Sequence, residues 1–98
     1  CAPCLEELPL FEKLHREHPN LVQVITISAD DPLALKRVMT QGDYTLPCLL
    51  DSTGEVTARY AVERLPRTLV IDSSGKVLSD QTGQLDQASL KALLAGLR

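Results

Sequence analysis

The first 28 residues, CAPCLEELPLFEKLHREHPNLVQVITIS, contain the pattern that decides the fold. Cys1 and Cys4 open a stretch, residues 5–18, in which apolar side chains recur at three-residue steps among charged ones. This spacing predicts an amphipathic helix with Cys4 in its first turn. Residues 21–28 form a β-branched, nearly continuous apolar run, which predicts a strand buried on both faces of a parallel sheet. A strand of that kind needs helices on both sides.

The rest of the chain alternates helical and strand patterns. Asp31 before Pro32 predicts an N-cap and a helix start, and Gly42 marks the end of that helix. The other predicted elements are a strand over residues 48–50, a brief helix over 55–62, strands over 68–71 and 76–78 joined by a hairpin loop, and a last helix capped by Asp86. No low-complexity linker interrupts this order, so the sequence predicts a single α/β domain over residues 1–98.

The composition describes an ordinary soluble domain. The chain has 98 residues, of which 44% are hydrophobic and 23% charged. Its formal net charge is -3, and its Lys and Arg residues are scattered rather than clustered. No apolar stretch approaches the ~20 residues of a membrane helix. We therefore expect no nucleic-acid partner and no membrane insertion by this segment.

The Cys-x-x-Cys pair carries the candidate chemistry. Two thiols with this spacing at a helix start lie close to the Cα separation of about 4.4–6.8 Å that a disulfide requires. The helix N-terminus stabilises a thiolate at the first position. We therefore predict that Cys1 is the nucleophile that attacks a partner's disulfide, and that Cys4 is the more shielded, resolving thiol.

A lone Cys-x-x-Cys also fits half of a structural zinc site. Cys1 and Cys4 are followed by His15 and His18, in the ligand order of a zinc finger. If Cys4 and His15 belong to one helix, its rise of ~1.5 Å per residue places them about 16 Å apart, too far to share one tetrahedral ion. We expect neither a bound metal nor a cofactor.

Taken in order, the motifs resemble the TlpA/ResA-like branch of the thioredoxin superfamily. They are CAPC at 1–4, Glu7, Pro9, the apolar run at 21–28, LPCLLD at 46–51, YAV at 60–62 and LPRTLVID at 65–72. The resemblance covers nearly the whole chain and implies a thioredoxin-like, three-layer fold with a mixed central sheet flanked by helices. It also implies that the strand preceding the dithiol is missing from this chain. The strands at 22–28 and 68–72 are then too far apart to hydrogen-bond to each other.

The resemblance implies an enzyme, a thiol-disulfide oxidoreductase of the bacterial periplasm or a membrane-tethered one. Such proteins receive electrons from a membrane or soluble thiol donor and reduce protein disulfides, often in cytochrome c maturation. The resemblance further implies that Pro66 is a cis-proline facing the dithiol. It implies that Glu7 exchanges protons with Cys4. A solvated helix carboxylate is the alternative for Glu7, and Pro9 is expected to kink the helix.

Three points stay open on the sequence. A peroxiredoxin-like thiol peroxidase and a redox-inert partner-binding domain are the alternative functions, although a second thiol one turn away favours disulfide exchange. Cys48 lies in an apolar strand and is predicted to be a buried, inert thiol rather than a third redox centre. Arg67 beside the expected cis-proline departs from the family pattern and leaves the substrate preference open.

Overall fold

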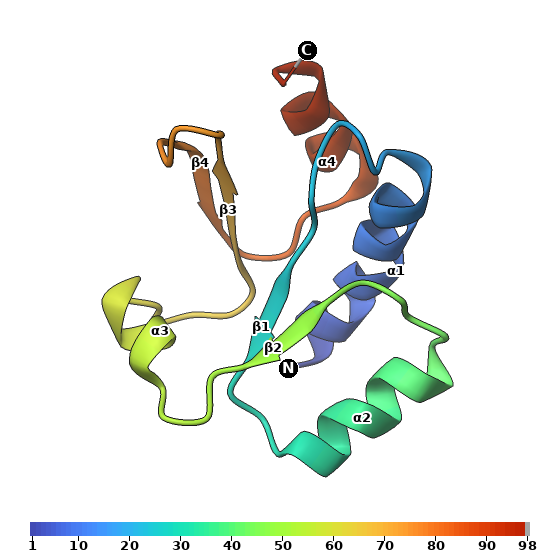
Figure 1. Cartoon of the computed structure of the whole chain (residues 1–98), viewed down its shortest axis with the longest axis vertical. Coiled ribbons are helices and arrows are strands. Elements are labelled where there is room, and N and C mark those ends of the chain that lie inside the picture. The colour runs from blue at the N-terminus through green and yellow to red at the C-terminus, as the bar shows by residue number, and fades with distance from the viewer. Residues whose placement is uncertain (98) are drawn as a thin grey trace. The chain divides into compact units, whose positions relative to one another are not determined.

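The structure is a computed structural model and describes residues 1–97. In that part of the chain four helices and four strands follow one another in the predicted order (Figure 1). Their bounds are α1 Ala2–Glu17, β1 Thr26–Ser28, α2 Pro32–Gln41, β2 Cys48–Leu50, α3 Glu55–Arg59, β3 Arg67–Ile71, β4 Val77–Thr82 and α4 Gln87–Ala95. None of the helices within residues 1–97 combines the length and the apolar content that a membrane crossing requires.

The strands pair two by two. β1 and β2 are parallel, with Ile27 opposite Leu49, and β3 and β4 are antiparallel, with Leu69 opposite Asp80. Within residues 1–97, β1 and β3 belong to different sheets. That the two strands are too far apart to hydrogen-bond to each other stays a prediction.

The chain divides into two compact units, which we describe separately. The first consists of Cys1–Glu7 together with the residues from Val62 onward, and we call it the disulfide unit. The second, Leu8–Ala61, we call the central unit. The single domain expected over residues 1–98 stays a prediction.

In the central unit the apolar core is small. Leu14, Val24 and Leu46 are its buried apolar residues. The strand predicted over residues 21–28 is shorter than expected, and Ile27 at its centre exposes 52% of its surface. The prediction that this strand is buried on both faces is therefore wrong for Ile27. The sheet that contains Ile27 has only two strands, and the helix α2 buries none of its own residues. Too few neighbouring residues therefore pack on the Ile27 side chain to bury it.

Buried carboxylates and helix caps fix the central unit. Glu12 accepts hydrogen bonds from the backbone N–H of Thr45 at 2.6 Å, the Thr45 hydroxyl at 2.7 Å and the backbone N–H of Leu46 at 3.0 Å. As predicted, Asp31 caps α2 by accepting from the N–H of Ala34, and that helix ends at Gly42.

The helix α3 ends earlier than the predicted helix over residues 55–62. It stops at Arg59, and Ala61 takes a left-handed conformation with φ of 50°. This conformation ends a helix, so the predicted continuation to residue 62 is wrong. At the other end of α3, the Asp51 carboxylate accepts from the N–H groups of Val56 and Thr57.

In the disulfide unit, β3 and β4 form the predicted hairpin. The Asp72 carboxylate accepts from the N–H groups of Ser74 and Lys76, which closes the loop. β4 continues to Thr82, four residues beyond the predicted end, because Ser79, Asp80 and Gln81 pair with β3 although they are polar. The last helix, α4, is capped as predicted by Asp86, which accepts from the N–H of Ser89 at 2.7 Å.

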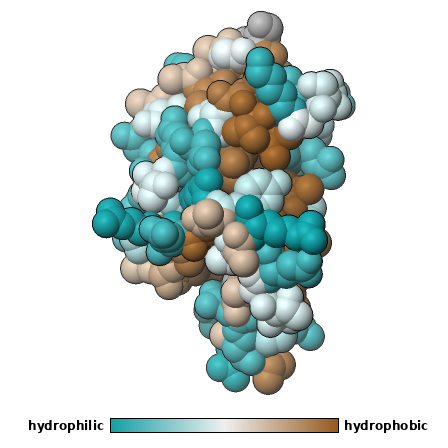
Figure 2. Space-filling model, turned by 90° about the vertical axis from the view of Figure 1, so that its left-hand side faces the viewer, coloured by the Kyte–Doolittle hydropathy of each residue, from teal (hydrophilic) through white to brown (hydrophobic). Residues whose placement is uncertain are grey.

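Large apolar side chains reach the surface in both units. In the central unit these include Ile25, Ile27, Leu49 and Leu50, and in the disulfide unit Leu65, Ile71, Val77 and Leu78. Figure 2 shows hydrophobic surface among hydrophilic surface on one face of the protein. Scattered apolar side chains are normal on a protein surface. Those on β1 and β2 differ in that they lie together on one sheet, which consists of a single pair of strands.

Candidate active site

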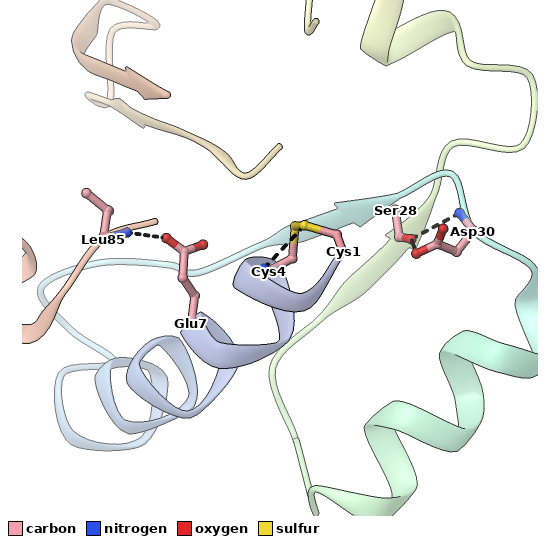
Figure 3. Close-up of a disulfide and its surroundings, with 6 residues drawn as sticks. All are labelled: Cys1, Cys4, Glu7, Ser28, Asp30 and Leu85. Carbon is pink, nitrogen blue, oxygen red and sulfur yellow. Dashed lines mark hydrogen bonds between the residues drawn. A yellow bond between two sulfur atoms is a disulfide. The ribbon is translucent and has the colours of Figure 1, made fainter. Parts of the chain in front are cut away.

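Cys1 and Cys4 form a disulfide at the N-terminal end of α1, with their Cα atoms 5.3 Å apart (Figure 3). The helix starts at Ala2, which confirms that the motif lies in the first turn. The backbone N–H of Cys4 donates to Sγ of Cys1 at 3.3 Å. A donor is therefore already directed at the Cys1 sulfur, where it stabilises negative charge when the S–S bond opens.

The two cysteine residues differ in exposure. Cys1 is exposed, whereas Cys4, one turn into the helix, is only partly exposed. An attacking thiol must reach a partner's disulfide, and a resolving thiol has to reach only its neighbour. The geometry thus suits the predicted order of roles, while the roles themselves stay predictions.

Glu7 lies one turn after Cys4 and is buried, with 4% of its surface exposed. Its Oε2 accepts the backbone N–H of Leu85 at 2.6 Å, and its side chain points to the same side of α1 as the disulfide (Figure 3). Burial raises the pKa of the Glu7 carboxyl above 4.5, and the Leu85 N–H partly offsets this rise. The interpretation of Glu7 as a solvated surface carboxylate is therefore wrong. Its part in proton exchange stays a prediction.

The Leu65–Pro66 peptide bond is cis, as the resemblance predicted. Pro66 is buried, and its carbonyl accepts the N–H of Gly83 at 2.8 Å. That Pro66 faces the dithiol stays a prediction. The following residue, Arg67, donates from Nε and Nη2 to the two carboxylate oxygens of Asp80 on β4, at 2.9 and 2.7 Å. This paired geometry directs the guanidinium along the hairpin and leaves the Arg67 side chain 18% exposed.

Cys48 lies outside this group of residues, in β2 of the central unit. It pairs with Thr26 of β1, and its thiol is free. Cys48 is partly exposed, so the prediction that it is buried is wrong: a two-stranded sheet does not cover it fully. Its redox inertness stays a prediction. Within residues 1–97, no cluster of three or more His, Cys, Asp or Glu side chains is arranged to hold a metal ion.

Sequence patterns could not predict two hydrogen-bonded contacts, those of Glu7 and of Glu12. Leu85 is 78 positions from Glu7, and Thr45 is 33 positions from Glu12, so no local periodicity links either pair. The one sequence signal at Glu12 is its four-residue spacing to Arg16, which forms an ion pair with it at 2.6 Å.

A helix that opens on a Cys-x-x-Cys disulfide, combined with a buried carboxylate one turn later and a cis-proline at the start of a hairpin, is typical of thioredoxin-like proteins of thiol-disulfide exchange. Comparison with known proteins agrees with this class. Residues 1–94 match the Redoxin family, and the chain belongs to that family.

Among curated relatives, the chain is 31% identical over 96 residues to "Thiol-disulfide oxidoreductase ResA" of Bacillus thuringiensis subsp. konkukian. The match covers 96% of this chain and 56% of that protein, so the chain spans little more than half the length of this relative.

Two solved structures show the fold. StoA from Bacillus subtilis superposes with a TM-score of 0.81 at 26% identity, covering 94% of this chain and 72% of that one. A thiol-disulfide isomerase from Corynebacterium glutamicum gives a TM-score of 0.81 at 27% identity, covering 99% and 73%. The predicted thioredoxin-like α/β fold is thus confirmed.

Proposed function

We propose that this protein exchanges electrons with protein disulfides through Cys1 and Cys4. The observation that carries the proposal is the disulfide at the start of α1, in which Cys1 is exposed and accepts the Cys4 N–H. The name of the ResA relative supports the same chemistry.

The reaction starts from the reduced pair and proceeds in two exchanges. The Cys1 thiolate attacks one sulfur of the partner's disulfide, and the partner's other sulfur leaves as a thiolate. Cys4, after losing its proton, then attacks Sγ of Cys1. The partner sulfur that is bonded to Cys1 leaves as a thiolate and takes up a proton. The products are the Cys1–Cys4 disulfide and a partner reduced by two electrons. A thiol donor returns the enzyme to its starting state by the reverse exchanges.

Glu7 is the proton acceptor in this scheme. Cys4 becomes a nucleophile only when its thiol loses a proton, and Glu7 lies one turn away on the same side of α1 (Figure 3). A buried carboxylate with a raised pKa is better matched to this transfer near neutral pH than an exposed one. Glu7→Gln is therefore expected to change the pH profile of disulfide exchange, and an unchanged profile would remove Glu7 from the scheme.

The setting of the reaction is a second part of the proposal. We place the protein outside the bacterial cytoplasm, as a reductase that takes electrons from a membrane or soluble thiol donor and acts on protein disulfides such as those met in cytochrome c maturation. Its support is the resemblance of the motifs to the TlpA/ResA-like branch. Fractionation of cells, with alkylation of free thiols at harvest, tests the location and shows which state of Cys1 and Cys4 prevails there.

A trapping experiment tests the chemistry. Cys4→Ser removes the resolving thiol, so insulin with intact disulfides should remain attached to the protein through Cys1. Cys1→Ser should form no adduct, and Cys48→Ser is the matched control that should behave like the wild type. An adduct on Cys48, or disulfide exchange that survives Cys1→Ser, would contradict the assignment.

The same variants test the alternatives. A peroxidase would consume hydrogen peroxide through Cys1 and would need Cys4 only to reduce the resulting sulfenic acid. A redox-inert binding domain would keep its partner when Cys1 is replaced by Ala. Peroxide consumption faster than insulin reduction, or unchanged activity in cells carrying Cys1→Ala, would overturn disulfide exchange as the function.

A further inference from the structure

The connector between β4 and α4, residues 83–85, makes two backbone contacts with residues of the candidate site. The N–H of Gly83 donates to the carbonyl of Pro66 at 2.8 Å, and the N–H of Leu85 donates to Oε2 of Glu7 at 2.6 Å. All of these residues belong to the disulfide unit. Two predicted site residues from distant parts of the sequence are thus held by donors two positions apart.

The connector is built to keep this geometry. Gly83 has φ of 104°, a backbone conformation that residues other than glycine rarely adopt. The Leu85 side chain is buried, with 4% of its surface exposed. Asp86 follows directly, and its carboxylate accepts the N–H of Ser89 and so faces the first turn of α4. The connector is therefore anchored by a glycine turn, a buried side chain and a helix cap.

The Leu85 contact acts on the carboxylate that the proposed exchange uses. A hydrogen bond from a backbone N–H to a carboxylate is stronger than one between neutral groups, so it fixes the orientation of the Glu7 head group. Oε2 accepts this bond, so one of the two carboxylate oxygens has a fixed partner. The N–H also stabilises the ionised carboxylate against the effect of burial, which otherwise raises the pKa of Glu7.

We propose that the connector 83–85 is a positioning element of the exchange site, which holds the cis-proline and the Glu7 carboxylate in a fixed relation through the N–H groups of Gly83 and Leu85. This inference rests on the proposed function. Leu85 is a positioning residue in it, because its backbone acts through Glu7 and touches no reacting sulfur. Its side chain enters only as an anchor, so the test has to separate the N–H group from the side chain.

Leu85→Pro removes the N–H, whereas Leu85→Met keeps it and preserves side-chain volume. The first measurement is the titration of the Glu7 carboxyl carbon by NMR in the oxidised protein. Leu85→Pro should move the midpoint to higher pH, and Leu85→Met should leave it unchanged. In the reduced protein, Leu85→Pro should slow the attack of Cys4 on the mixed disulfide by about tenfold or more at pH 7, because the loss of a fixed head-group orientation outweighs the gain in basicity. Equal titration curves for the two folded variants would overturn the proposal.

A measurement on the unaltered connector covers the case in which Leu85→Pro does not fold. The amide proton of Leu85 should shift with pH along the same curve as the Glu7 carboxyl, and this shift should vanish in Glu7→Gln. If the chemical shift of the Leu85 amide proton does not change as Glu7 titrates, the hydrogen bond between them is overturned. If these couplings hold but the wild type fails to reduce insulin, the proposed function is overturned while the hydrogen bond stands.

Discussion

Replacing Glu12 by Gln tests how the central unit is held together. Glu12 is 7% exposed, and its carboxylate accepts four hydrogen bonds, from Arg16, the N–H and hydroxyl of Thr45, and the N–H of Leu46. Every neighbour of its two oxygens is a donor. In Glu12→Gln, an NH2 group replaces one of the two oxygens. This group cannot accept hydrogen bonds, so the variant loses the bonds that the replaced oxygen accepted.

The magnitude follows from the pKa of Glu12. Desolvation by burial raises this pKa, but hydrogen bonds from Thr45, Arg16 and Leu46 outweigh it and lower the pKa from 4.5 to about 2. The full difference corresponds to about 3 kcal/mol. The Arg16 side chain is 57% exposed, so solvent screens part of its contribution, and we expect about 2 kcal/mol.

The sign of the pH dependence follows from the same shift. A carboxyl group with a lowered pKa in the folded state contributes stability above its unfolded pKa of 4.5, and this stability is lost as the pH falls toward about 2. Urea unfolding followed by far-UV circular dichroism at several pH values measures it. Glu12→Gln should be about 2 kcal/mol less stable than the wild type at pH 7, and the difference should shrink below pH 4.5 and disappear as the pH falls through about 2.

The control is Glu17→Gln, because Glu17 is an exposed carboxylate at the end of the same helix. It should leave the unfolding free energy within about 0.5 kcal/mol of the wild type. If the stabilities of Glu12→Gln and the wild type run parallel from pH 7 to pH 2.5, the carboxylate does not hold α1 to residues 45 and 46, and the reasoning fails.

Three further predictions concern single positions. Ala61→Gly should stabilise the protein by about 1 kcal/mol because Ala61 is left-handed, whereas Ala58→Gly inside α3 should destabilise it by a similar amount; thermal melts of both variants check the contrast. Burial raises the pKa of Glu7, so its ionised form costs folding free energy. Glu7→Gln should therefore be more stable than the wild type at pH 7 to 8 and lose this advantage below pH 4.5; denaturant titrations in which the difference does not change with pH contradict this. Asp86→Ala removes the cap of α4 and should cost about 1 kcal/mol of unfolding free energy, whereas an unchanged melting curve would show that the Ser89 contact contributes nothing.

Local chemistry made much of the fold predictable. The caps at Asp31 and Asp86 and the stop at Gly42 depend on residues within one turn of each helix end, so the sequence contains the whole contact. The strand over residues 48–50 was predicted with its observed bounds, since its apolar run ends at a turn sequence. The cis bond at Pro66 came from the family resemblance and not from any rule of composition.

Several failures share a cause, which is dependence on partners outside the predicted element. The apolar run over residues 21–28 predicted full burial, but the exposure of Ile27 is decided by what packs on β1, and the run does not show that. β4 extends through polar residues because β3 pairs with them. Glu7 was placed at the site by resemblance, but its burial and its Leu85 contact required the folded chain.

Two turns with nearly the same sequence lead to different structures in this protein. DSTG at residues 51–54 precedes the helix α3, whereas DSSG at 72–75 joins two antiparallel strands. In each, the aspartate carboxylate accepts backbone N–H groups that come after it. The residue after the glycine differs in charge: Glu55 complements the positive end of a helix, and Lys76 does not. The same aspartate turn is thus compatible with both a helix and a hairpin, and the charge of the residue after the glycine is one difference between the two segments that matches their structures.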